Sequence, residues 1–207
     1  MSPIPPGLVL GDDGIRRCWW GAGDALYRRY HDREWGRPIK NDRRLFEKIC
    51  LEGFQSGLSW LIILRKRENF RRAFRDFDVE AIARFNARTV DRLMEDAGIV
   101  RNQAKILSVI NNARRCLTLI EERGSLGAYA WSFEPRSTSR LVPVSAEAVA
   151  MSKDLKRRGW SFVGPTTVHS FMQAVGIIND HLAGCHMRRE VEDLRKRFVR
   201  PSPRPPR

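Results

Sequence analysis

The segment DRRLFEKICLEGFQSGLSW, residues 42–60, determines the fold class. Leu45, Phe46, Ile49 and Phe54 recur near a period of 3.6 residues, which predicts a helix over 42–56 with one apolar face. Gly57 then interrupts the pattern, and Ser59 can cap a second helix. The segment therefore predicts two consecutive helices joined by a glycine turn.

Helical patterns continue on the carboxyl side. The second helix carries apolar residues from Leu61 to Phe77 on one side and several arginines on the rest of its surface. A short helix ends at Gly98, a longer one spans Ile106 to Ile120, and two more are expected over 145–158 and 166–178. No stretch of five or more residues alternates strictly, as a half-buried strand would. We therefore expect an all-α fold.

Length and composition predict one compact domain, or two small ones sharing a core, in a chain of 207 residues with 42% apolar residues. We expect this domain over 16–194, between a flexible arm at 1–15 and a basic, proline-rich tail at 195–207 that does not fold by itself. The net charge of +14 favours a polyanionic partner, first of all nucleic acid; a basic protein without such a partner is the alternative.

The absence of a long apolar run and of a secretory leader predicts a protein of the reducing cytosol without a membrane partner. Disulfides are disfavoured there. The four cysteines are therefore expected to be buried thiols, metal ligands or nucleophiles, namely Cys18, Cys50, Cys116 and Cys185.

Residues 93–102 favour a helix-hairpin-helix, a motif that here occupies about 88–123. Gly98 can adopt a positive φ at the turn, and the free N–H groups that open the next helix can hold a DNA phosphate. Arg101 and Lys105 add positive charge beside them. The alternative is an ordinary helix that ends in a glycine cap.

Two Cys–His pairs lie near opposite ends of the chain. His181 and Cys185 are four positions apart, and Cys18 and His31 form the other candidate pair. Two Cys and two His can close a tetrahedral zinc site, although the spacing of the first pair fits no zinc-finger pattern. The alternatives are surface histidines with buried thiols, or His186 as a competing ligand.

Glu52 interrupts an apolar run, and Trp60 follows eight residues later. On a continuous helix these two side chains would point to neighbouring faces, about 80° apart. A carboxylate near tryptophan and tyrosine can form a pocket for a flipped purine, because the ring stacks and the carboxylate accepts a hydrogen bond from an exocyclic amine. A solvated glutamate and a core tryptophan are the alternative.

At the level of motifs, the chain resembles the DNA-3-methyladenine glycosylase I family. The matching segments span about residues 17–185 and include RCWW (17–20), LYRRYHDREWGRP (26–38), LFEKICLEGFQSGLSW (45–60), KRENFRRAF (66–74), DAGIVRNQAKI (96–106), SKDLKRRGWSFVGPT (152–166) and SFMQAVGIINDHLAGC (170–185). Small departures from the family pattern are Ala25, Gln103 and His169.

The resemblance implies a helix-hairpin-helix fold in which one structural zinc ion ties the ends of the domain together. It assigns the zinc ligands to Cys18, His31, His181 and Cys185, and the base pocket to Glu52, Trp60, Tyr30, Tyr27 and Trp20. Asn102 occupies the position where related lyases carry a catalytic lysine, so the implied reaction is hydrolysis without a lyase step. The implied substrate is double-stranded alkylated DNA, and the implied product is free 3-methyladenine.

The resemblance further implies a monomeric bacterial protein that reaches the nucleoid through DNA. Leu58, in the turn before Trp60, is the candidate wedge for the gap that the extruded base leaves. Two rival functions stay open: a zinc-stabilised DNA-binding protein without catalysis, and a glycosylase of another specificity, such as 3-methylguanine.

Overall fold

The computed structural model describes residues 6–136 and 142–202. Within these ranges the chain is mostly helical, as expected, with a small two-stranded sheet in addition. The elements are β1 (Leu8–Leu10), β2 (Arg16–Cys18), the 3-10 turn η1 (Trp19–Gly21), α1 (Ala25–Arg33), α2 (Asp42–Gln55), α3 (Trp60–Ala73), the 3-10 turn η2 (Arg75–Phe77), α4 (Val79–Ala83), α5 (Ala87–Glu95), α6 (Gln103–Arg123), α7 (Leu126–Trp131), α8 (Ala146–Arg157), α9 (Pro165–Ala174) and α10 (Met187–Arg197).

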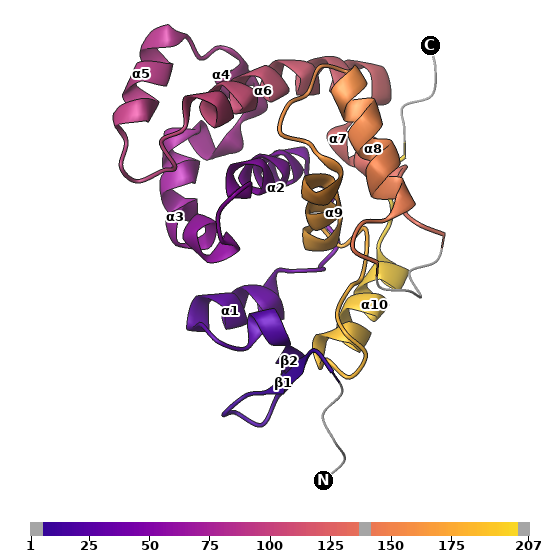
Figure 1. The fold of residues 1–207 in the computed structure, drawn as a ribbon. Coiled ribbons are helices and arrows are strands. Elements are labelled where there is room, and N and C mark those ends of the chain that lie inside the picture. Colours follow the sequence, from indigo (N-terminus) through magenta and orange to yellow (C-terminus); the bar gives the residue numbers. More distant parts are fainter. Residues whose placement is uncertain (1–5, 137–141, 203–207) are drawn as a thin grey trace.

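Helix α2 is the central element of the core. The side chain of Asn41 caps it by accepting a hydrogen bond from the Arg44 N–H, and every residue from Leu45 to Phe54 is buried. It contacts α3 and α6 on one side and α7 and α9 on the other, and Figure 1 shows it in the middle of the molecule. The apolar period in the sequence therefore located the helix correctly, although burial extends all around it.

The amino-terminal segment is more ordered than the expected flexible arm. Leu8–Leu10 pairs antiparallel with Arg16–Cys18, so that Leu8 lies opposite Cys18. Leu8 also packs in a small apolar cluster with Cys18 and Cys185. Three-residue strands are too short to give an alternating sequence signal, which explains why the hairpin was not expected.

The basic tail is also docked as far as the structure describes it. Helix α10 continues to Arg197 and buries Arg195, whose guanidinium donates to the Gly176 carbonyl and lies 2.9 Å from the Glu134 carboxylate. The Phe198 ring packs on Trp131, with the ring centroids 4.5 Å apart. Residues 203–207 lie outside the described part of the chain.

The expected helix over 166–178 is shorter than the apolar pattern. It ends at Ala174 because the chain turns at Gly176, which has a φ of +78°. A Cβ at this glycine would lie 2.5 Å from the Gly36 carbonyl oxygen, so the backbone before α2 approaches too closely for any other residue. None of the helices in the described ranges is long and apolar enough to cross a membrane.

Candidate base pocket and metal centre

The two Cys–His pairs meet in one buried cluster beneath the amino-terminal hairpin. The metal-ligating atoms of Cys18, His31, His181 and Cys185 all lie within 4.8 Å of one another. Cys185 Sγ is 3.5 Å from His31 Nε2 and 3.6 Å from His181 Nδ1, and Cys18 Sγ is 3.9 Å from His181 Nδ1. These four side chains could hold a metal ion.

Both histidines are oriented by oxygen atoms behind them. His31 Nδ1 lies 2.8 Å from the Asp32 carboxylate, and His181 Nε2 lies 3.3 Å from the Trp35 carbonyl oxygen. Such contacts fix the tautomer and the ring orientation of metal-binding histidines. His186, the competing ligand, instead contacts Asp32 Oδ1 at 2.9 Å, the same carboxylate oxygen that lies beside His31.

The charge of the cluster also suits a cation. The pKa of Cys185 is held well below its usual range, chiefly because the Cys18 thiol donates a hydrogen bond to it and also because of its contacts with His181 and His31. A thiolate is the form of cysteine that binds metals. Cys50 and Cys116 are buried elsewhere in the core, and burial raises the pKa of both thiols, which is consistent with inert packing.

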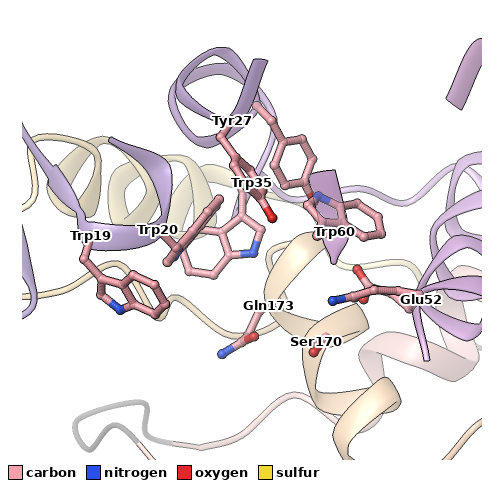
Figure 2. Close-up of a pocket in the computed structure, with 10 residues that line it drawn as sticks. Trp19, Trp20, Tyr27, Trp35, Glu52, Trp60, Ser170 and Gln173 are labelled. Carbon is pink, nitrogen blue, oxygen red and sulfur yellow. The ribbon is translucent and has the colours of Figure 1, made fainter. Parts of the chain in front are cut away.

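A cavity of about 400 Å³ opens beside this cluster. Its walls come from η1, α1, α2, α3 and α9. Figure 2 shows aromatic rings along one side and the polar side chains of α9 on the opposite side. The lining residues are Trp19, Trp20, Tyr27, Tyr30, Trp35, Glu52, Gln55, Trp60, Ser170 and Gln173.

Glu52 contributes a buried carboxyl group to this cavity from the core helix α2. Burial raises its pKa to about 8, and the charge of Lys48, one helical turn earlier, opposes the shift. Lys48 is itself buried, and burial lowers its pKa to about 8. Its ammonium lies 4.6 Å from the centre of the Tyr30 ring, and Tyr30 lines the cavity whereas Lys48 does not.

The aromatic rings of the wall pack against one another, Trp20 and Trp35 edge to face and Tyr30 and Trp60 at a tilt of 48°. The Tyr30 and Trp60 ring centroids are 5.6 Å apart, and those of Trp20 and Trp35 are 4.9 Å apart. The Tyr27 hydroxyl accepts a hydrogen bond of 3.0 Å from the Leu61 N–H and thereby ties α1 to the start of α3. Glu52 and Trp60 lie on different helices, α2 and α3, because the turn at Gly57 separates them, so the angle expected for one continuous helix does not apply.

Sequence reasoning missed part of the lining. It named Glu52, Trp60, Tyr30, Tyr27 and Trp20, all of which the structure brings together at the cavity. It assigned no role there to five further residues, namely Trp19, Trp35, Gln55, Ser170 and Gln173. Ser170 and Gln173 are three positions apart on α9, so their i, i+3 spacing, which places two polar side chains on one face of the helix, was the available signal.

The turn between α5 and α6 differs from expectation at Gly98. Its φ is not positive; instead, its N–H donates to the Asp96 carboxylate at 2.7 Å. A Cβ at this position would lie 2.8 Å from that carboxylate and 3.0 Å from the Asn69 amide. A larger residue is therefore disfavoured here by close side-chain contacts and not by the backbone angle.

Lys105 does not lie on the surface as a phosphate ligand would. Its buried ammonium donates to the carbonyl oxygens of Phe54 and Ser56, at 2.8 and 2.6 Å, and so closes the end of α2. Arg101 and Leu58, by contrast, are exposed, as a DNA contact requires.

A helical fold with an aromatic cavity large enough for a purine, and a buried carboxyl group inside it, has the features expected of a DNA glycosylase, an enzyme class that binds a single base outside the DNA stack. The comparison with known proteins is more specific. Residues 19–189 match the model of the methyladenine glycosylase family, and the chain belongs to this family.

Individual relatives agree with this assignment. DNA-3-methyladenine glycosylase 1 of Escherichia coli (strain K12) is 45% identical over 83% of this chain and 96% of its own length. The DNA-3-methyladenine glycosylase of Haemophilus influenzae is 41% identical over 82% of this chain and 96% of its own length. A crystal structure of 3-methyladenine DNA glycosylase I superposes with a TM-score of 0.76 at 44% identity, covering 82% of this chain and 98% of the other. The structure of the Staphylococcus aureus enzyme, solved to explain 3-methyladenine recognition, superposes with a TM-score of 0.77 at 36% identity. The superposition covers 81% of this chain and 94% of the other.

The activity expected from the sequence is therefore confirmed. The chain is an N-glycosyl hydrolase that excises 3-methyladenine in base excision repair.

Proposed function

We propose that the cavity is the pocket that receives 3-methyladenine after the base is flipped out of double-stranded DNA. The observation that carries this proposal is the buried Glu52 carboxyl group among aromatic rings. Methylation at N3 gives the base a formal positive charge, which stacking on Trp60 favours by roughly 1–2 kcal/mol through cation–π attraction. A relative has been solved in complex with 3-methyladenine, which supports the free base as the ligand.

Glu52 serves the cationic base in two ways. It accepts a hydrogen bond from the exocyclic N6 amine. The positive charge of the bound base lowers the raised pKa of Glu52, so that the group ionises in the complex, and its negative charge then stabilises the positive charge that develops on the sugar as the bond to the base breaks. The bond electrons neutralise the departing base, while a water molecule adds to C1′ and releases a proton. Normal adenine lacks the positive charge, so its bond is stronger and it is spared.

The reaction is hydrolysis without a lyase step. Among the described residues that line the cavity, none is a lysine that could form a Schiff base. Asn102 stands where related lyases carry lysine, and its side chain caps α6 by accepting from the Lys105 N–H. Lys105 itself is occupied by two carbonyl oxygens.

The Cys–His cluster is proposed to hold one zinc ion. With Zn–S of about 2.3 Å and Zn–N of about 2.0–2.1 Å, a tetrahedral site separates sulfur and nitrogen ligands by roughly 3.6 Å. The corresponding distances to Cys185 are 3.5 and 3.6 Å, and the Cys18–His181 distance is 3.9 Å. Four protein ligands leave no open position, so the metal stabilises the fold and takes no part in the reaction.

DNA is proposed to lie across the α5–α6 turn and the turn before α3, with the turn from Asp96 to Asn102 acting as a helix-hairpin-helix. The exposed Arg101 and the N–H groups that open α6 suit a backbone phosphate. Leu58, which follows Gly57 with its φ of +78°, is the proposed wedge. The protein is proposed to act as a monomer.

Single-turnover excision from methylated DNA tests the pocket. Glu52→Gln and Trp60→Ala are each expected to slow 3-methyladenine release strongly, whereas Glu121→Gln, an exposed control on α6, is expected to match wild type. Binding of free 3-methyladenine should weaken in the same two pocket variants. Release at the wild-type rate by both pocket variants would contradict the assignment.

A further inference from the structure

The Gln173 side chain is the polar group on the α9 side of the cavity with the most restricted orientation. It lines the cavity beside Ser170, across from the rings of Tyr27 and Trp35 (Figure 2). An amide presents a donor at one end and an acceptor at the other. Which end faces the cavity therefore decides what this wall can recognise.

Asp180 determines the direction of the amide. Gln173 Nε2 donates a hydrogen bond of 2.6 Å to Asp180 Oδ2, and the amide nitrogen is the only end of the glutamine side chain that can donate. The Asp180 side chain is 7% exposed, so water cannot readily replace this contact. The amide nitrogen is thereby held at Asp180, and the carbonyl oxygen Oε1 is left as an acceptor on the other side.

His169 supports the same arrangement from behind. The Ser145 N–H donates to His169 Nδ1 at 3.4 Å, so in the neutral ring Nδ1 is the acceptor and Nε2 carries the hydrogen. Nε2 faces Asp180 Oδ2 at 3.5 Å and lies 3.3 Å from Gln173 Nε2. Two N–H groups thus converge on one carboxylate oxygen, and rotating the amide would instead direct its carbonyl oxygen at that carboxylate.

We propose that Gln173 is a specificity-determining residue whose fixed Oε1 accepts a hydrogen bond from the exocyclic amine of 3-methyladenine. In the N3-methylated nucleotide the ring nitrogens N1 and N7 are acceptors, N3 carries the methyl group and N9 carries the sugar. The amine is therefore the only N–H group that an acceptor can recognise. Glu52 takes one of its two hydrogens and Gln173 the other; this inference rests on the base pocket proposed above.

The fixed amide also discriminates against 3-methylguanine. That base presents a carbonyl oxygen, O6, where adenine has its amine, so O6 would face Gln173 Oε1 and two acceptors would meet without a hydrogen between them. Leaving polar groups unpaired in a buried site is a strong source of selectivity. Asp180 and His169 act through Gln173 as positioning residues.

Excision of both bases from one preparation of methylated DNA tests this inference. Gln173→Met keeps the length of the side chain and removes the acceptor. We expect its kcat/KM for 3-methyladenine to fall roughly 10- to 100-fold, as for loss of a hydrogen bond to a charged partner, while 3-methylguanine excision does not fall. A proportional loss for both bases, or no loss for either, would overturn the inference.

Asp180→Asn supplies the second variant. An asparagine amide can donate to Gln173 Oε1, which allows the glutamine to turn its NH₂ toward the cavity. We expect 3-methyladenine excision to fall and 3-methylguanine excision to rise, at unchanged metal content, which must be measured because His181 is adjacent. An unchanged ratio between the two bases would count against the orienting role.

The Glu52→Gln variant distinguishes an error in the role of Gln173 from an error in the pocket assignment. If Glu52→Gln is impaired and Gln173→Met is not, the role of Gln173 is wrong and the pocket stands. If neither is impaired, the pocket itself is wrong.

Discussion

Glu52 reduces the stability of the protein that contains it. Its pKa is raised from 4.5 to about 8 because the carboxyl group is buried, so the folded protein binds a proton that the unfolded chain has released over this range. Stability therefore falls as the pH rises from about 4.5 to about 8. One pH unit within this window is worth about 1.4 kcal/mol.

Glu52→Gln keeps the shape of the side chain and cannot ionise, so it should remove this loss. The free energy of unfolding of the variant should exceed that of wild type by about 1 kcal/mol at pH 5 and by up to about 3 kcal/mol at pH 7. For a chain of this size each kcal/mol corresponds to about 2–4 °C in Tm, so the variant should melt roughly 6–12 °C higher at pH 7.

Thermal and urea unfolding of both proteins at pH 5, 6 and 7 give the measurement. Any change in metal occupancy with pH affects wild type and variant alike and cancels in the difference. A variant that is no more stable than wild type at pH 7, or a difference that does not grow with pH, would refute the argument. The expected result is a variant that is more stable and less active, because a residue needed for activity often reduces the stability of the folded protein.

Three further expectations concern the metal and the DNA surface. Metal analysis should find one zinc per wild-type chain, lost in Cys185→Ala but kept in His186→Ala; zinc retained by the first variant would shift the fourth ligand to His186. Gly98→Val should weaken binding to DNA with an abasic-site analogue across a salt titration, yet leave binding of free 3-methyladenine unchanged, because its side chain would collide with Asp96 and Asn69; unchanged DNA affinity would make the turn a mere helix junction. Lys105→Met should lower Tm by roughly 4–8 °C, because two carbonyl oxygens at the end of α2 lose a charged donor worth about 2 kcal/mol; a change below about 2 °C would contradict this role.

The sequence predicted the helices well where an apolar period was long, as in α2 and α6. It failed at β1, whose three residues are too few to show alternation, and at the tail, where Arg195 is buried through contacts with Gly176 and Glu134. Contacts between residues so far apart along the chain cannot be predicted from the composition of the segment around Arg195.

The site was predicted unevenly for a similar reason. Spacing alone left the set of metal ligands open, and the resemblance to a family selected four residues that the structure does bring together. Lys105 looked like a phosphate ligand because charge beside a helix start suggests one, but its direction depends on the end of α2. Gln173 lies within the matching segment 170–185 but carries no charge and was given no role there, so its place in the cavity became evident only in three dimensions.

The cluster that joins the two ends of the domain has a consequence for how the protein is made. Cys18 and His181 are 163 positions apart, and His31 and Cys185 are 154 apart. At roughly 5–20 residues per second, synthesis leaves the first Cys–His pair without its partners for about 8–30 s. During that time Cys18 is an unprotected thiol on a growing chain, exposed to oxidants and to stray metal ions. The cluster can therefore close only after the end of the domain has been made, and a chain truncated before residue 181 would lack half of the residues that surround the site.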